Sequence, residues 1–129
     1  MDKILEEKLI EARSAKEKLF EYFRILAKFN EEEKETTQLI IVEIFKNADL
    51  LKLSEEKSIV VFQEVLGEII NEGMQHGEFR SDLNITHVAD ILASIYFHTL
   101  FSWLQGKLSK SLTFELSGRI KIIINGIEP

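Results

Sequence analysis

The chain has 129 residues, of which 45% are hydrophobic and 29% charged, with one proline and no cysteine. This length and composition allow a substantial buried core, which excludes intrinsic disorder and predicts a single folded domain over residues 1–129. A chain without cysteine can hold neither a disulfide nor a zinc ion bound by thiolates. It also fits a reducing cytoplasm, the localisation that we expect.

The formal net charge is −6, and the acidic excess is spread along the chain rather than gathered in one half. Because no basic segment is present to neutralise phosphates, we do not expect the chain to bind nucleic acid by itself. The longest uninterrupted apolar runs have four residues, whereas a membrane span needs about 20. The sequence therefore predicts no membrane partner, and its charged N-terminal segment does not resemble a signal peptide.

Helix caps and breakers predict six helices in chain order. The first precedes Ser14, and the second starts at the capping-box sequence Ser14 to Glu17 and ends near Phe29. Asn30, followed by three glutamates, is the expected N-cap of the third helix, which ends between residues 47 and 49.

The other three helices follow from the same kind of reasoning. Ser54 is the expected N-cap of a helix that runs to Gln75 or His76 and stops at Gly77. A connection over residues 77–83 leads to Asn84, the expected N-cap of a helix from Ile85 to Gln105. The last helix is expected from Leu112 to Asn125, ending at Gly126. Strand patterns are absent, so the predicted fold class is all-α.

The helix from Ile85 and the last helix both carry apolar residues on two sides. A helix that is apolar on two sides must be buried on two sides, which is difficult for the terminal helices of a small domain. We therefore predict that residues 84–126 form a four-helix interface between two copies of the chain, as a homodimer. The alternative is that these helices are the central ones of a monomeric bundle. The residues expected at the interface are Ser94, Phe97, His98, Phe101, Gly118 and Ile122.

Aromatic residues stand on the inward faces of several predicted helices. Such rings usually fill a core, but they can also line a pocket in which a few polar groups orient a small ligand. The residues that we consider for such a pocket are Phe23, Phe45, Phe62, Tyr96, Thr99 and Trp103. Each of them also fits the simpler interpretation of an ordinary core residue.

No pattern points to catalysis or to a metal. His87 and His98 would lie about 16 Å apart on one helix, too far to share an ion. Glu64, Glu68 and Glu72 share a helical face but lack the Glu-x-x-His pairs of a di-iron bundle. The sequence Gly106-Lys107 lacks the earlier glycine of a phosphate-binding loop. We predict no enzyme activity, no catalytic residue, no metal and no cofactor.

Residues 64–82, EVLGEIINEGMQHGEFRSD, precede a helix that begins with Val88-Ala89 and closes on Trp103-Leu104. With the ending at residues 123–127, this pattern resembles the C-terminal domain of the TetR family of bacterial transcriptional regulators. The resemblance implies an all-α homodimer joined through its last two helices and a cavity among the middle helices for a small, often apolar molecule. It also implies a connector-like helix over residues 1–14, whose position responds to the ligand.

The resemblance does not include the family's N-terminal helix-turn-helix, which would precede Met1. DNA is therefore an expected partner only through an N-terminal domain absent from this chain. We expect the chain to be either a piece of a longer regulator or a sensor that naturally lacks the DNA-binding domain. The predicted function is effector binding and dimerisation, with a small apolar or aromatic molecule as the effector. The alternative is a helical dimerisation or adaptor module that binds no small molecule.

Overall fold

A computed structural model describes residues 14–47, 49 and 60–129, with the side chains of residues 44, 45 and 60 left out. The described residues form five α-helices and no strand, so the predicted all-α class is confirmed. The helices are α2 (Ala15–Glu32), α3 (Lys34–Lys46), α5 (Val60–Gln75), α6 (Ile85–Leu104) and α7 (Leu112–Ile127). The expected helix at residues 1–14 and the expected N-cap Ser54 lie outside the described residues.

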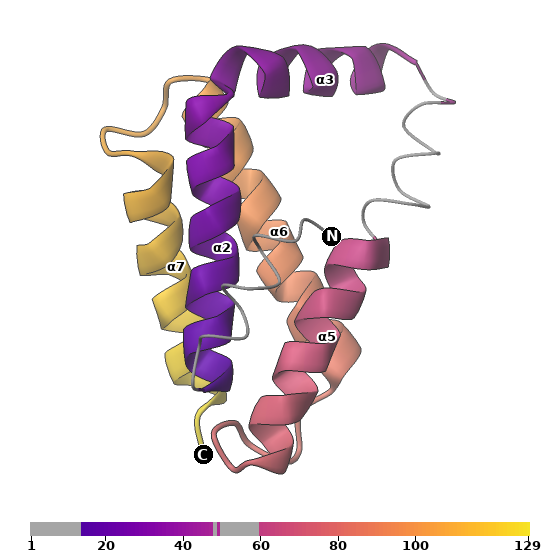
Figure 1. Cartoon of the computed structure of the whole chain (residues 1–129), viewed down its shortest axis with the longest axis vertical. Helices are drawn as coiled ribbons and strands as arrows, with labels where there is room; N and C mark the ends of the chain where they lie inside the picture. Colours follow the sequence, from indigo (N-terminus) through magenta and orange to yellow (C-terminus); the bar gives the residue numbers. More distant parts are fainter. Residues whose placement is uncertain (1–13, 48, 50–59) are drawn as a thin grey trace.

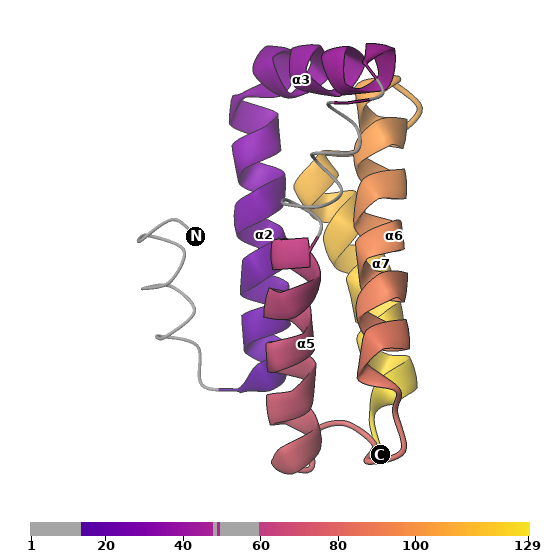
Figure 2. The same ribbon diagram turned by 90° about the vertical axis from the view of Figure 1, so that its right-hand side faces the viewer.

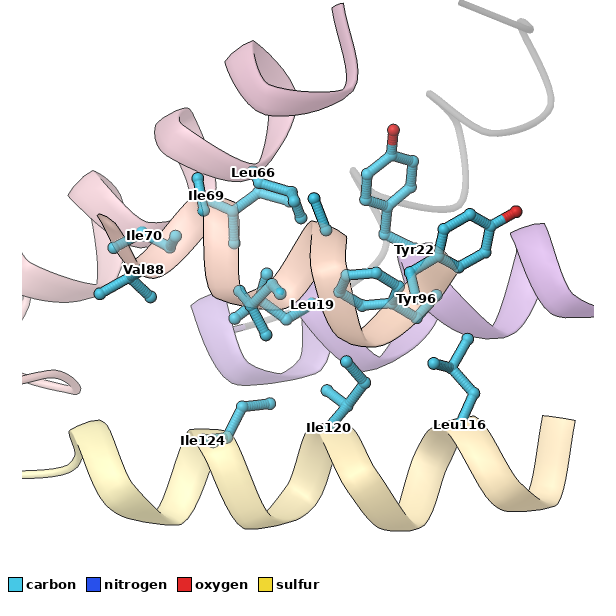
Figure 3. Packing of buried hydrophobic residues seen from close by; sticks show 14 of the residues in the cluster. Leu19, Tyr22, Leu66, Ile69, Ile70, Val88, Tyr96, Leu116, Ile120 and Ile124 are labelled. Carbon is cyan, nitrogen blue, oxygen red and sulfur yellow. The ribbon is translucent and has the colours of Figure 1, made fainter. Parts of the chain in front are cut away.

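Four helices run along the long axis of the molecule, and α3 lies across one end of them (Figures 1 and 2). Helix α2 packs most extensively against α7, and α5 packs most extensively against α6. The core lies where these four helices meet, and α7 contributes a row of fully or almost fully buried side chains: Leu112, Leu116, Ile120 and Ile124. The last three of them are labelled in Figure 3.

Three helix ends agree with the predictions because their determinants are local. The Ser14 hydroxyl accepts a hydrogen bond from the Glu17 amide at 3.1 Å, and the Asn84 side chain accepts one from the His87 amide at 3.0 Å. Gly77, which follows α5, has a φ of +74°, the left-handed conformation that glycine adopts without steric cost. These caps are confirmed.

The prediction that Asn30 caps the third helix is wrong. Asn30 lies inside α2, which continues to Glu32, and α3 begins only at Lys34. Its side chain is buried and donates hydrogen bonds to the Leu26 carbonyl and to the Tyr96 hydroxyl. The side-chain oxygen, with which a cap would accept from a backbone amide, instead accepts from the Thr37 hydroxyl.

The last helix also passes its predicted end at Gly126. Helix α7 includes Ile127, whose side chain is buried and whose carbonyl accepts a hydrogen bond from the Arg80 amide at 2.8 Å. These contacts with the α5–α6 turn stabilise the additional residues, so Gly126 does not stop the helix.

Candidate functional site

A cluster of five aromatic rings occupies the space between α2, α5 and α6. The smallest distance between ring centroids, 5.1 Å, joins Tyr96 and Phe97, and Phe62 lies 5.4 Å from Tyr96. Phe23 of α2 lies 6.0 Å from Phe62 and 6.1 Å from Tyr96, and Tyr22 is the fifth member. These spacings are typical of favourable tilted and edge-to-face contacts, each worth about 0.5–1.5 kcal/mol beyond the buried area. We call this group the ring cluster.

The ring cluster carries a small polar network at its α3 side. Asn30 donates to the Tyr96 hydroxyl at 2.7 Å, and its carbonyl oxygen accepts from the Thr37 hydroxyl at 3.1 Å. Asn30 and Thr37 are both buried. The network thus places hydrogen-bonding groups of α2, α3 and α6 beside a predominantly aromatic surface.

Two phenol hydroxyls belong to the ring cluster, and both point away from α7 (Figure 3). Burial, with a contribution from the nearby Tyr96, raises the pKa of Tyr22 to about 12. Burial also raises the pKa of Tyr96, although the hydrogen bond from Asn30 acts in the opposite direction. Both hydroxyls therefore stay protonated at neutral pH and can donate as well as accept hydrogen bonds.

The structure brings together three of the six residues considered for a pocket, Phe23, Phe62 and Tyr96. Thr99 is fully buried on another side of α6, where its hydroxyl accepts from the Arg119 guanidinium at 2.8 Å. Trp103 is half-buried, and the Lys34 ammonium lies 4.7 Å from its ring centroid. Phe45 belongs to α3, but its side chain is outside the described part of the structure.

The outer side of α6 and α7 forms an apolar groove of about 410 Å³. Three of the predicted interface residues line it: Ser94, His98 and Ile122. The Ile122 side chain is 70% exposed. Gly118, one turn before Ile122, has open space where a Cβ would stand. We call this surface, with Gly118 included, the outer groove.

The other two predicted interface residues lie elsewhere. Phe97 belongs to the ring cluster, and Phe101 is its neighbour at 6.2 Å between centroids. The apolar stripe of α6 that the sequence pattern assigned to one interface is therefore divided between two surfaces.

A second, smaller groove of about 230 Å³ lies between α5 and α6. Gln63 on one side donates to the Asp90 carboxylate on the other at 2.7 Å. Over the residues that the structure describes, no three histidine or acidic side chains gather as a metal site would require. Within the same residues, no helix has the length and apolarity needed to cross a bilayer.

Residues 1–126 match the model of the C-terminal domain of TetR/AcrR family transcriptional repressors. The chain belongs to this family. The match covers nearly all of the sequence, and the predicted resemblance is confirmed. Comparisons with curated proteins and with solved structures gave no match.

Membership assigns the chain to a class of domains that in general bind effectors and dimerise, and that is not a class of enzymes. Sequence reasoning missed Asn30, Thr37 and Arg119 as residues that shape the two surfaces. The three glutamates after Asn30 indicated a helix start, and no local pattern showed that Thr37 would lie beside it. Arg119 follows Gly118 on the same helix, and no local pattern shows that its guanidinium would donate to Thr99 of α6.

Proposed function

We propose that this chain is the effector-binding and dimerisation domain of a TetR/AcrR repressor, in which α6 serves both tasks through opposite sides. Its inner side contributes Tyr96 and Phe97 to the ring cluster, which takes a small aromatic or apolar effector. Its outer side forms, with α7, the groove that a second copy covers. The observation that carries this proposal is that α6 has a closed ring cluster on one side and an open apolar groove, formed with α7, on the other.

The proposed dimer interface consists of Ser94, His98, Gly118 and Ile122. The groove is lined mainly by apolar atoms, and covering such a surface contributes about 25 cal/mol for each Å² removed from water. The bare backbone at Gly118 allows another helix to approach closely. In a two-fold arrangement the same residues of both copies meet, which suits a groove that runs along two helices.

The proposed effector is a small aromatic molecule with one hydrogen-bonding group. Phe23 and Phe62 offer ring faces and edges, and the hydroxyls of Tyr22 and Tyr96 offer protonated phenols at neutral pH. Because the rings contact one another, an effector that enters must separate them. The effector binds only if its contacts with the rings are more favourable in free energy than the ring-to-ring contacts that it replaces.

Sedimentation of the parent chain and of Ile122→Glu tests the dimer. At 10 µM we expect the parent to sediment as a dimer and Ile122→Glu as a monomer, since covering the groove would remove the charged carboxylate from water among mainly apolar atoms. The matched control is Lys121→Glu, which introduces the same side chain at the adjacent exposed position and should remain dimeric. A monomeric parent, or equal effects of the two variants, contradicts the proposed interface.

Titration with 1-naphthol and naphthalene tests the effector class, with the fluorescence of Trp103, the single tryptophan, as the readout. We expect 1-naphthol to bind more tightly than naphthalene, and Tyr96→Phe to abolish that preference while keeping naphthalene binding. If neither probe binds at millimolar concentration and the chain still dimerises, the adaptor alternative replaces the sensor.

A further inference from the structure

The N-terminus of α2, the C-terminal end of α5 and the turn at residues 76–83 meet at one junction. The Glu78 carboxylate, from the turn, accepts hydrogen bonds from the backbone amides of Ala15 at 2.9 Å and Lys16 at 3.4 Å. The first amides of a helix lack acceptors within the helix, so a carboxylate from another element both satisfies them and interacts favourably with the helix dipole. A residue more than 60 positions away in the sequence therefore adds to the local cap at Ser14.

The turn is folded back onto α5 so that Glu78 can reach α2. The amides of Glu78 and Phe79 both donate to the Gly73 carbonyl, at 2.8 and 3.1 Å. A Cβ on Gly73 would overlap the Phe79 ring and would lie 3.1 Å from the Cβ of Ala15. Ala15 and Phe79 are almost completely buried. Only glycine at position 73 allows the three segments to approach this closely.

Two ion pairs and one backbone hydrogen bond surround the junction. Lys18 of α2 contacts Glu72 of α5 at 2.8 Å, and Lys16 contacts Glu128, just after α7, at 3.0 Å. The Arg80 amide donates to the Ile127 carbonyl at 2.8 Å. The start of α2 is therefore tied to α5, to the turn and to the end of α7.

We propose that Glu78 is a positioning residue that makes the start of α2 and the α5–α6 turn move as one body. The residues before Ser14 are attached to the domain at this point. A displacement of the turn then displaces the start of α2. The proposal rests on contacts within one copy of the chain, so it stands independently of the dimer and the effector.

Glu31 provides a matched control at the opposite end of α2. Its carboxylate accepts from the Thr113 amide, in the first turn of α7, at 2.8 Å. Glu31 and Glu78 thus perform the same kind of capping across two elements, but only Glu78 joins the α5–α6 turn to α2. Glu78→Gln and Glu31→Gln change the two caps in the same way.

Amide hydrogen exchange, measured by NMR, provides the first test. For each amide we divide the intrinsic exchange rate by the measured rate to obtain a protection factor. In the parent chain we expect the protection factors of the Ala15 and Phe79 amides to agree within about threefold, because the two amides open together. Glu78→Gln should accelerate Ala15 exchange at least tenfold and leave Thr113 unchanged, and Glu31→Gln should do the reverse. Exchange of Ala15 more than tenfold faster than Phe79 in the parent overturns the proposal even if Glu78→Gln does not fold.

A distance measurement separates positioning from a purely local contribution to stability. The chain lacks cysteine, so spin labels can be placed at Glu17→Cys on α2 and Glu64→Cys on α5, both exposed. The labelled chain is diluted with unlabelled chain so that only distances within one copy are observed. We expect Glu78→Gln to broaden the distance distribution and Glu31→Gln to leave it at the parent width. Equal widths in all three proteins overturn the proposal, even if both variants melt at lower temperature.

Discussion

The ring cluster on the inner side of α6 and the outer groove that α6 forms with α7 both present apolar surface, but they differ in exposure within one chain. On the inner side, rings from α2 and α5 cover Tyr96, which is 7% exposed, whereas across the outer groove Ile122 remains 70% exposed. Apolar area contributes to stability only when it is removed from water. The inner side therefore stabilises the fold of one copy, whereas the outer groove would contribute only when the proposed second copy covers it.

The largest expected effect compares a buried phenylalanine of the ring cluster with an exposed phenylalanine that lies outside it. Phe23 is 2% exposed and belongs to the ring cluster, whereas Phe114, on α7, is 64% exposed. We expect Phe23→Ala to lower the free energy of unfolding by about 3–5 kcal/mol, and Phe114→Ala to change it by no more than about 0.5 kcal/mol. Urea unfolding at one fixed protein concentration measures both, since association adds to apparent stability. A similar loss of unfolding free energy in both variants would contradict the closed packing of the ring cluster.

A smaller difference in the free energy of unfolding is expected when alanine replaces each of two glycines. Gly73→Ala places a methyl group against the Phe79 ring, and overpacking of this kind costs about 1–3 kcal/mol. Gly118→Ala meets open space, so the higher helix propensity of alanine should stabilise the isolated chain by up to about 1 kcal/mol. The same variant should weaken dimerisation if another backbone approaches Gly118. Thermal unfolding and sedimentation of the two variants separate these effects, and a destabilised monomeric Gly118→Ala would show that the outer groove is already closed within one copy.

The parts of the fold that the sequence predicted are those decided within a few residues. Ser14, Asn84 and Gly77 act on amides or carbonyls of their own helix ends, and each lies where the pattern indicated. Asn30 has the same local features as a cap, but its side-chain oxygen accepts from the Thr37 hydroxyl and its NH2 group donates to the Tyr96 hydroxyl 66 positions later. The contact that decides its role does not exist until α2 and α6 pack together.

The candidate site shows the same limit. On the sequence alone, Tyr96 and Thr99 are grouped in one candidate pocket, and the structure separates their side chains between the ring cluster and Arg119 of α7. Periodicity gives the angle of a residue around its own helix, but not which neighbouring helix occupies that angle. The ring contacts of Phe97 depend on where α5 lies, which the sequence of α6 does not contain.

Tyr22→Phe is expected to have the smallest effect on the free energy of unfolding at neutral pH. The effect becomes larger at alkaline pH. An unfolded tyrosine titrates near pH 10, whereas burial raises the pKa of Tyr22 to about 12. Below pH 10 both states are protonated, and this group gives no pH dependence. Between pH 10 and about 12 the unfolded state loses its proton first, so stability falls as the pH rises, by about 2 kcal/mol in total.

Tyr22→Phe keeps the ring packing and removes the titrating hydroxyl, so its stability should decline less steeply than that of the parent between pH 10 and 12. Urea unfolding at pH 8 and at pH 11 measures the change, and lysine deprotonation, common to both proteins, cancels in the comparison. Tyr96→Phe is the contrasting variant, because it also removes the acceptor of the Asn30 hydrogen bond and should lose stability already at pH 8. Parallel pH dependences of the parent and Tyr22→Phe would mean that the Tyr22 hydroxyl is hydrated, and that the ring cluster is open to water on that side.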